Sequence, residues 1–293
     1  MKRRHFLHNL AHVAAAPTIF SSLAFDKLDF SSNSFLSNTI EDGKIIVIIK
    51  MDGGNDGLNT VIPLDQMTAL SSARPHVILP ENKIVSLNSS DLGLHPALSD
   101  FKTLFNEDRL KIIQNVGYPT PDFSHFRSMD IWQSASDSNQ YLTSGWMARY
   151  IEDRHPSYPE EYPNEKYPHP LAVEMGWQSA LLFTGKKSFT SFLARNPTNF
   201  QEIINEFDNE YPSDNKGNKL KYLQLIAKQS NIYSKIIKEK YENGKNTFSY
   251  GNSNLERQLE IVSQLISGGL KSRIYFVEIG GFDTHDTQVD QSD

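Results

Sequence analysis

The chain has 293 residues, a length that suits one large α/β domain or two smaller ones. Its formal net charge is -6, and its lysines lie among acidic residues, so the sequence offers no basic surface for nucleic acid. It contains no cysteine, which excludes disulfide bonds, thiolate nucleophiles and cysteine-ligated zinc. A metal would have to be bound by Asp, Glu, His, Asn or main-chain oxygen.

The first 25 residues are typical of a twin-arginine export signal. Lys2, Arg3 and Arg4 make a basic start, and a weakly apolar, alanine-rich segment follows. The alternative is an ordinary basic amphipathic amino-terminus, and the segment is too weakly apolar for a stable membrane span. We expect a protein that the twin-arginine machinery exports already folded, to the periplasm or outside the cell. Residues 26–42, rich in Ser and Asn, predict a linker.

The first predicted core strand is the apolar run from Ile45 to Ile49. Its β-branched residues favour a buried, parallel strand. The loop that follows contains three glycines and four side chains that carry an oxygen ligand, namely Asp52, Asn55, Asp56 and Asn59. Open α/β sheets bind metals and ligands at the carboxyl ends of their strands, so this loop is a candidate site. The alternative is a polar turn without a ligand.

The next stretch predicts an alternation of strands and helices. The expected elements are a helix over 65–74, a strand over 84–87, a helix that begins at Pro96 and a strand over 110–116. Such connections within one sheet are normally right-handed crossovers between parallel strands. We therefore expect an α/β fold, with a mostly parallel central sheet flanked by helices, over residues 43–293.

A second polar cluster follows the predicted strand at 110–116. Asp122 or Ser124 can cap a helix, which would place Ser124, His125 and Arg127 in its first turn. Unpaired amides at that position favour an anion or an activated hydroxyl, so these three residues are catalytic candidates. The alternative is that Ser124 is only an N-cap and Arg127 a surface residue.

The middle of the chain is less regular. Its expected elements are a helix over 144–153, a surface excursion over 156–170, short strands over 171–175 and 180–183, and a solvent-facing helical insertion over 196–246. The helix within that insertion, over 220–241, would pack by one face.

The last predicted strand, Arg273 to Ile279, follows an amphipathic helix over 255–266 and runs into the sequence G-G-F-D-T-H. In an extended segment, Asp283 and His285 would point to the same side, where both could ligate one divalent metal. The alternative is a polar turn with a capping aspartate. Two strands that each end in Gly-Gly and an acid favour one shared site at the carboxyl edge of the sheet.

Three segments together resemble a known family. They are G-G-N-D-G-L-N at 53–59, L-H-P-A-L at 94–98 with G-Y-P-T-P-D-F-S-H-F-R-S-M-D-I-W at 117–132, and G-G-F-D-T-H at 280–285. With the twin-arginine start, they are similar to the exported bacterial proteins called domain-of-unknown-function family 1501. That family is related to the alkaline phosphatase and sulfatase superfamily, and the resemblance runs from about residue 1 to the end of the chain.

The resemblance implies an alkaline-phosphatase-like core that hydrolyses phosphate or sulfate esters with divalent metals, here Zn, Mn, Mg or Ca. It implies one metal ligand on the first strand and two more after a later strand, which would be Asp52 or Asp56, Asp283 and His285. Ser124 would be the nucleophile and Arg127 would hold the anion. Metal coordination lowers the pKa of a hydroxyl, and a guanidinium suits a tetrahedral oxyanion.

One departure concerns the carboxyl end. The family continues to a further strand and a second Asp-His motif, whereas this sequence ends at Asp293, eight residues after His285. We therefore expect either a fragment or half a metal site, with a core incomplete on its C-terminal side and weak or no hydrolysis by this chain alone. Two hypotheses follow. One is an exported metal-dependent hydrolase of small anionic esters, and the other is a non-catalytic exported binding or assembly protein that keeps the fold.

Overall fold

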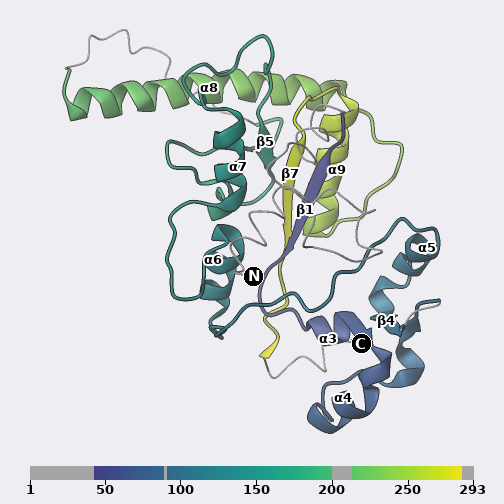
Figure 1. Ribbon diagram of the computed structural model, residues 1–293. Coiled ribbons are helices and arrows are strands. Elements are labelled where there is room, and N and C mark those ends of the chain that lie inside the picture. The colour runs from purple at the N-terminus through teal and green to yellow at the C-terminus, as the bar shows by residue number, and fades with distance from the viewer. Residues whose placement is uncertain (1–42, 89–90, 200–212, 286–293) are drawn as a thin grey trace, which may run out of the picture. The chain divides into compact units, whose positions relative to one another are not determined.

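The computed structural model describes residues 43–88, 91–199 and 213–285 (Figure 1). The predicted export signal, the linker and part of the predicted insertion lie outside these residues. The chain forms two compact units, whose described residues are 43–50 with Tyr118–Ile279 and Met51–Gly117 with 280–285. Among the described residues, no helix is both long enough and apolar enough to cross a membrane.

The larger unit is built on a four-stranded parallel sheet, which confirms the predicted α/β class. Its strands are β1 (Ile46–Met51), β7 (Ile274–Ile279), β5 (Ala172–Glu174) and β6 (Phe192–Leu193), in the order β1-β7-β5-β6. Val173 of β5 lies opposite Tyr275 of β7 and Phe192 of β6. Strands distant in sequence are thus neighbours, as parallel crossover connections require.

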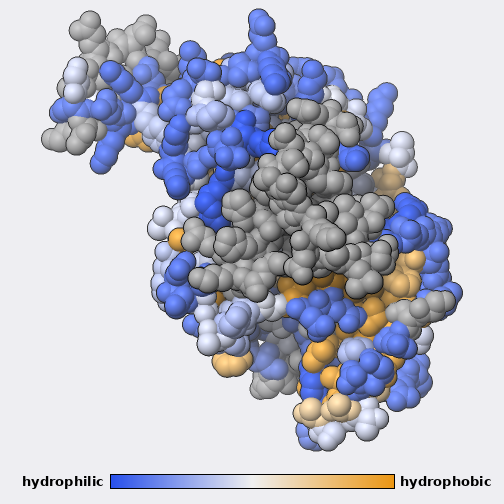
Figure 2. All heavy atoms as spheres, in the orientation of Figure 1, coloured by the Kyte–Doolittle hydropathy of each residue, from blue (hydrophilic) through white to orange (hydrophobic). Residues whose placement is uncertain are grey.

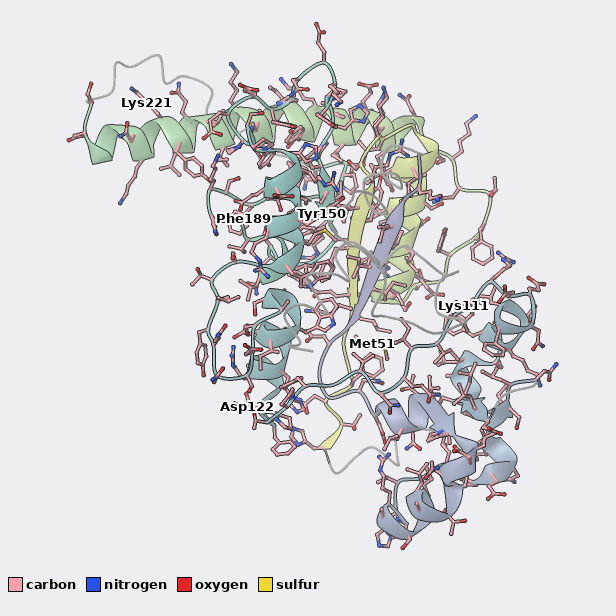
Figure 3. The ribbon with its side chains drawn as sticks, viewed as in Figure 1. Met51, Lys111, Asp122, Tyr150, Phe189 and Lys221 are labelled. Carbon is pink, nitrogen blue, oxygen red and sulfur yellow. The ribbon has the colours of Figure 1, made fainter. Side chains whose placement is uncertain are left out.

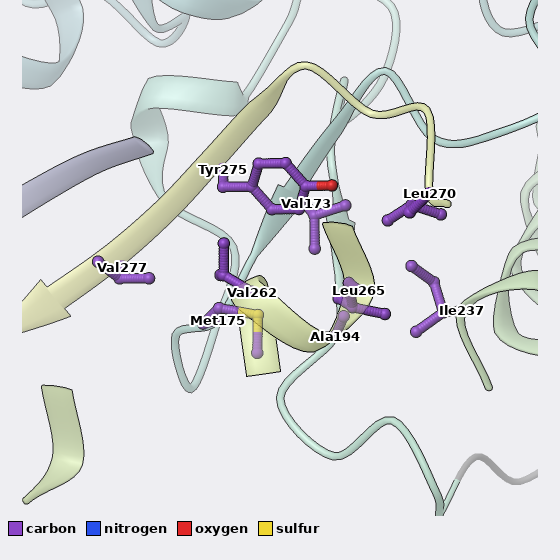
Figure 4. Close-up of a cluster of buried hydrophobic side chains, with 9 residues drawn as sticks. All are labelled: Val173, Met175, Ala194, Ile237, Val262, Leu265, Leu270, Tyr275 and Val277. Atoms are coloured by element: carbon purple, nitrogen blue, oxygen red, sulfur yellow. The ribbon is translucent and has the colours of Figure 1, made fainter. Parts of the chain in front are cut away.

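Helices cover both faces of this sheet. Successive residues of β7 point to opposite sides, so its side chains enter the core on each face. Ile274 and Phe276 pack against α7 (Trp146–Arg154) and the 3-10 turn η5 (Leu181–Phe183). Tyr275 and Val277 pack on the other side against α8 (Asn215–Asn243) and α9 (Asn254–Ser267), as Figure 4 shows. This two-sided burial explains why β7 reads as a continuous apolar run.

The helices at 144–153 and 255–266 were predicted correctly. α9 begins with a capping box, in which Ser253 accepts from the main-chain N–H of Glu256 and the Glu256 carboxylate accepts from the N–H of Ser253. It ends at Gly268, and its residues Val262 and Leu265 are buried against the sheet.

The helix predicted within the 196–246 insertion is α8, and it only partly faces solvent. Near its start, Leu220 and Leu223 are 47% and 61% exposed, and most of the α8 surface visible in Figure 2 is hydrophilic. Toward its end, Tyr233 and Ile237 are buried, and Ile237 belongs to the core on the α9 side of the sheet. The second half of α8 therefore packs by one face, as predicted, and forms one layer of the fold.

The smaller unit contains a three-stranded antiparallel sheet with the order β2-β4-β3, formed by β2 (Val61–Pro63), β4 (Leu92–Leu94) and β3 (Val85–Ser86). Its helical elements are α3 (Gly57–Thr60), η2 (Leu64–Gln66), α4 (Met67–Ala73), η3 (Glu81–Lys83), η4 (Pro96–Leu98) and α5 (Phe101–Asn106). A small core of Ile62, Met67, Leu70 and Leu79 joins the sheet to α4. The structure confirms the helix predicted at 65–74 and the strand predicted at 84–87.

Three predictions about strands were wrong. Residues 110–116 form no strand, and Ile113 and Val116 are 54% and 69% exposed, because no neighbouring strand pairs with this segment in the described residues. The strands after β1 form the separate antiparallel sheet instead of a parallel crossover. The strand predicted at 180–183 is the 3-10 turn η5.

β1 was predicted as a buried strand but is an edge strand of its sheet. In the described part of the chain it has one neighbour, β7, and its residues Val47 and Ile49 are 38% and 47% exposed. A β-branched run therefore located the strand correctly without revealing its place in the sheet, which depends on distant segments.

Candidate functional site

The turn after β7 holds the predicted metal ligands Asp283 and His285. Their side chains lie together, with 2.7 Å between Oδ1 of Asp283 and Nε2 of His285, although His285 has a φ of +45° and the segment is not the extended one that the prediction assumed. Both side chains face solvent, with 49% and 73% of their surface exposed. A carboxylate oxygen and an imidazole nitrogen are thus presented together by one short turn in the smaller unit.

The loop after β1 packs directly against this turn within the same unit. Gly53 has a φ of +111°, and a Cβ atom added there would lie 2.7 Å from the main-chain nitrogen of Asp283 and 3.0 Å from the carbonyl carbon of Phe282. Only glycine adopts this backbone conformation and this close approach without strain. The two Gly-Gly-acid strand endings are therefore in contact, and half-buried Asp52 directly precedes the contact.

Asp56, the other candidate ligand of this loop, is engaged in a local network. Its Oδ2 accepts from the Arg74 guanidinium and, at 2.9 Å, from the Asn59 amide. Asn59 also donates to the carbonyl of Val77 at 2.6 Å. In this structure Asp56 therefore anchors α3 to the segment after α4, and its role as a metal ligand stays a prediction.

Ser124 is the N-cap of α6 (His125–Ser134), in the larger unit. Its Oγ accepts from the main-chain N–H of Arg127 at 3.4 Å, and its own N–H donates to Oδ1 of Asp122 at 2.8 Å. Figure 3 marks Asp122 at the start of this helix. The exposed hydroxyl of Ser124 thus lies beside first-turn amides, as predicted, in a geometry that an ordinary cap also produces.

Arg127 is buried and orders a loop of the larger unit. Its guanidinium donates to the carbonyls of Asp137, Ser138 and Gln140 at 3.3, 3.0 and 2.6 Å, and it stacks 4.0 Å over the Tyr141 ring. The alternative interpretation, in which Arg127 is a surface residue, is therefore wrong. Its predicted contact with a substrate anion stays a prediction, since the three carbonyls engage its Nη2 atom here.

The predicted residues fall into two sets. Ser124, His125 and Arg127 lie in the first turn of α6 in the larger unit, where His125 is half-buried. Asp52, Asp56, Asp283 and His285 belong to the smaller unit, where the structure brings the Asp52 loop and the Asp283 turn together.

Sequence reasoning missed a charged cluster at the carboxyl edge of the parallel sheet. Lys50 of β1 and Glu278 of β7 form an ion pair with a distance of 3.0 Å between Nζ and Oε2. Glu174, at the end of β5, is fully buried and accepts from the N–H of Ala180 at 2.7 Å and from the Ser191 hydroxyl. Burial raises the pKa of Glu174 to about 7, against the lowering effect of its two hydrogen bonds.

A simple signal could have located this cluster. Three apolar runs of the sequence end in a charged residue, at K-I-I-V-I-I-K50, L-A-V-E174 and I-Y-F-V-E278. The carboxyl ends of neighbouring parallel strands lie at one edge of a sheet, so charges at the ends of β1, β7 and β5 are neighbours.

Comparison with known proteins gives no match, whether to a protein-family model, a curated protein or a solved structure. Function is therefore inferred from the chemistry of the residues.

Proposed function

We propose that this chain is an exported, metal-dependent hydrolase of phosphate or sulfate esters, with Asp283, His285 and Asp52 as metal ligands. The observation that carries this proposal is the Asp283–His285 pair, 2.7 Å apart on an exposed turn that packs against the loop after β1. The resemblance to family 1501 supports the same assignment.

The donor set suits a divalent cation. Two ligand atoms of one tetrahedral cation lie about 3.3 Å apart when each bond is about 2.0–2.1 Å. Oδ1 of Asp283 and Nε2 of His285 are 2.7 Å apart, so a small rotation of either side chain accommodates an ion. Oxygen and imidazole ligands together suit Zn or Mn, and the exposure of both side chains leaves positions for water and substrate.

Each residue has a distinct task in this proposal. A bound divalent cation supplies Lewis-acid stabilisation of the charge that develops on the transferred group. Asp283 and His285 hold the cation on the turn, and Asp52 contributes a carboxylate from the neighbouring loop. Gly53 allows the two loops to touch, since any side chain there would meet the main chain of Asp283.

The test is hydrolysis of p-nitrophenyl phosphate and p-nitrophenyl sulfate at high protein concentration, with added Zn or Mn and with EDTA as the control. We expect slow hydrolysis that requires metal and is lost in Asp283→Ala and His285→Ala. His76→Ala is the matched control, because His76 is an exposed histidine of the same unit. Hydrolysis that persists in EDTA would contradict the proposal.

Export is a separate part of the proposal and is carried by the twin-arginine pattern alone. Replacing Arg3 and Arg4 by lysine should leave the protein in the cytoplasmic fraction of a host with this export machinery. Unchanged export of that variant would reject this part.

The second candidate function is a non-catalytic exported binding or assembly protein. It is favoured by the engagement of the predicted catalytic side chains, since Ser124 caps α6 and Arg127 donates to main-chain carbonyls. A protein that binds metal at Asp283 and His285 but hydrolyses neither ester would support this second function.

A further inference from the structure

The open side of β1 is apolar on one face. Ile46 and Ile48 pack into the core on the α7 side of the sheet, and Ile45 packs into the core on the α9 side. Val47 and Ile49 share the side of Ile45 by strand alternation, yet they are 38% and 47% exposed. On the α9 side of β1, the β-branched side chains of Val47 and Ile49 are therefore partly exposed.

A groove runs beside this face of β1. It has a volume of about 400 Å³ and is lined by Val47 of β1, by Leu259, Val262 and Ile266 of α9, and by Tyr250. Most of its lining is apolar, as expected of a surface that a further side-chain layer can cover. The groove lies within the larger unit.

Between Lys44 and Lys50, the edge of β1 carries none of the usual protection against strand pairing. Natural edge strands carry proline, a bulge or an inward-pointing charge that discourages a new neighbour. Residues 45–49 are Ile-Ile-Val-Ile-Ile, without a charge or a proline. Among the described residues the only strand beside β1 is β7, and within them the outer edge of β1 is unpaired.

The symmetry of the β1 sequence favours a second copy of β1 as a further strand at this edge. From Lys44 to Lys50 it reads K-I-I-V-I-I-K, the same in both directions about Val47. Two copies related by a twofold axis at Val47 would pair antiparallel, with each residue opposite its own residue type. Ile45 would then lie opposite Ile49 of the partner subunit, and every pair on the α9 face would be apolar.

Charges favour this register over its neighbours. A shift by two residues would place Lys50 opposite Ile46 of the partner subunit, so that on the α7 side a charged residue would face an isoleucine in place of an apolar pair. In the centred register the lysines meet only at the ends of the paired segment. There, the charge of Lys50 is already compensated by Glu278 at 3.0 Å.

We propose that this chain forms a symmetric dimer through antiparallel pairing of two β1 strands centred on Val47. The pairing joins the two parallel sheets edge to edge and covers both grooves beside α9. The proposal is independent of the proposed hydrolase activity, because it uses none of the proposed metal ligands.

Cysteine crosslinking tests both the dimer and its register, because the native chain has no cysteine. In full-length Val47→Cys, the two thiols would lie directly opposite, with Cα atoms about 4.5–5.5 Å apart, within reach of a disulfide. Ile45→Cys alone should not crosslink, because its two copies would be about 13 Å apart along the strands. A mixture of Ile45→Cys and Ile49→Cys should crosslink.

A second variant tests the association without cysteine. Val47→Lys places two positive charges opposite each other at the twofold axis, so the dissociation constant from analytical ultracentrifugation should rise at least about tenfold. Leu223→Lys is the matched control, since Leu223 is 61% exposed on α8 and should leave association unchanged. Thermal melting of both variants checks that they fold.

Three results would overturn the proposal. They are a wild-type chain that stays monomeric at 100 micromolar, a Val47→Lys dimer of undiminished affinity, and crosslinking of Ile45→Cys as efficient as that of Val47→Cys. The last result would show association in another register or by another surface.

Discussion

Glu174 accepts a hydrogen bond from the main-chain N–H of Ala180 at 2.7 Å while its side chain is fully buried. It also accepts from the Ser191 hydroxyl, so one carboxyl at the end of β5 holds both ends of the segment that contains η5. Glu278 and Lys50 act on it with opposite signs, the first raising and the second lowering its pKa.

Glu174 should make the protein less stable as the pH rises. Burial raises the pKa of Glu174 from the ordinary value of 4.5 to about 7, so the folded chain keeps a proton that the unfolded chain has lost. The stabilisation is complete below pH 4.5 and disappears as the pH rises through about 7, a change of about 3 kcal/mol at most.

Glu174→Gln removes this titration while keeping an acceptor for Ala180. We would measure the free energy of unfolding of both proteins in urea from pH 4.5 to 8. The value for the wild type, relative to that for the variant, should fall as the pH rises. A constant difference across that range would contradict the role of Glu174.

The Lys50–Glu278 ion pair should stabilise the larger unit. Only 10% and 26% of the two side-chain surfaces are exposed, so removing one partner leaves a partly buried charge. We expect Lys50→Met and Glu278→Gln each to cost about 1–3 kcal/mol, with the double variant less destabilised than the sum. A double-mutant cycle by urea unfolding measures the coupling, and additive losses would show that the pair contributes nothing.

Arg127→Lys should destabilise the protein even though it keeps the charge. Lysine cannot stack a planar guanidinium on the Tyr141 ring while it places a donor at Nη2, the atom that donates to the carbonyls of Asp137, Ser138 and Gln140, so we expect a loss of about 1–3 kcal/mol. Hydrogen exchange should quicken in residues 137–141. If Arg127 serves mainly to hold a substrate anion, the variant will keep its melting temperature and lose only activity.

His155 should make the protein less stable as the pH falls, which is the opposite of the effect of Glu174. Burial, with help from Lys166 and Arg154, lowers its pKa from 6.5 to about 4, and its Nδ1 lies 2.8 Å from the Tyr162 hydroxyl. Between these pH values the unfolded chain binds a proton that the folded chain does not. The contribution of neutral His155 to the stability of the fold is therefore complete above pH 6.5 and is lost as the pH falls through about 4.

An NMR titration of the histidine ring protons checks this assignment, with His155→Asn identifying the resonance. The His155 signal should stay that of a neutral ring down to about pH 5. A midpoint near 6.5 would show that the ring is solvated.

Local sequence patterns predicted the elements that carry their own signal. The helices α7 and α9 and the strands β5 and β7 follow from apolar periodicity and from residues such as Gly268. β2, β4 and β6 were missed because two or three residues are too few for a period. The edge position of β1 and the irregular segment at 110–116 depend on which distant strands pair, and no local pattern encodes that choice.

The same distinction holds for the candidate site. The proximity of Asp283 and His285 arises within a three-residue stretch, so the sequence could mark them as a pair, although the prediction assumed an extended segment and His285 has a φ of +45°. The task of Arg127 depends on a loop that begins ten residues later, and the burial of Glu174 depends on elements over the whole larger unit. Such long-range contacts are visible only in the folded chain.

The most direct test of the proposed metal site is elemental analysis of the purified protein after incubation with Zn or Mn and removal of free metal. We predict stoichiometric metal in the wild type and in His76→Ala, and its loss in the double variant Asp283→Ala/His285→Ala with the melting temperature otherwise unchanged. Equal metal content in the wild type and the double variant, or none in either, would contradict the assignment of Asp283 and His285 as ligands.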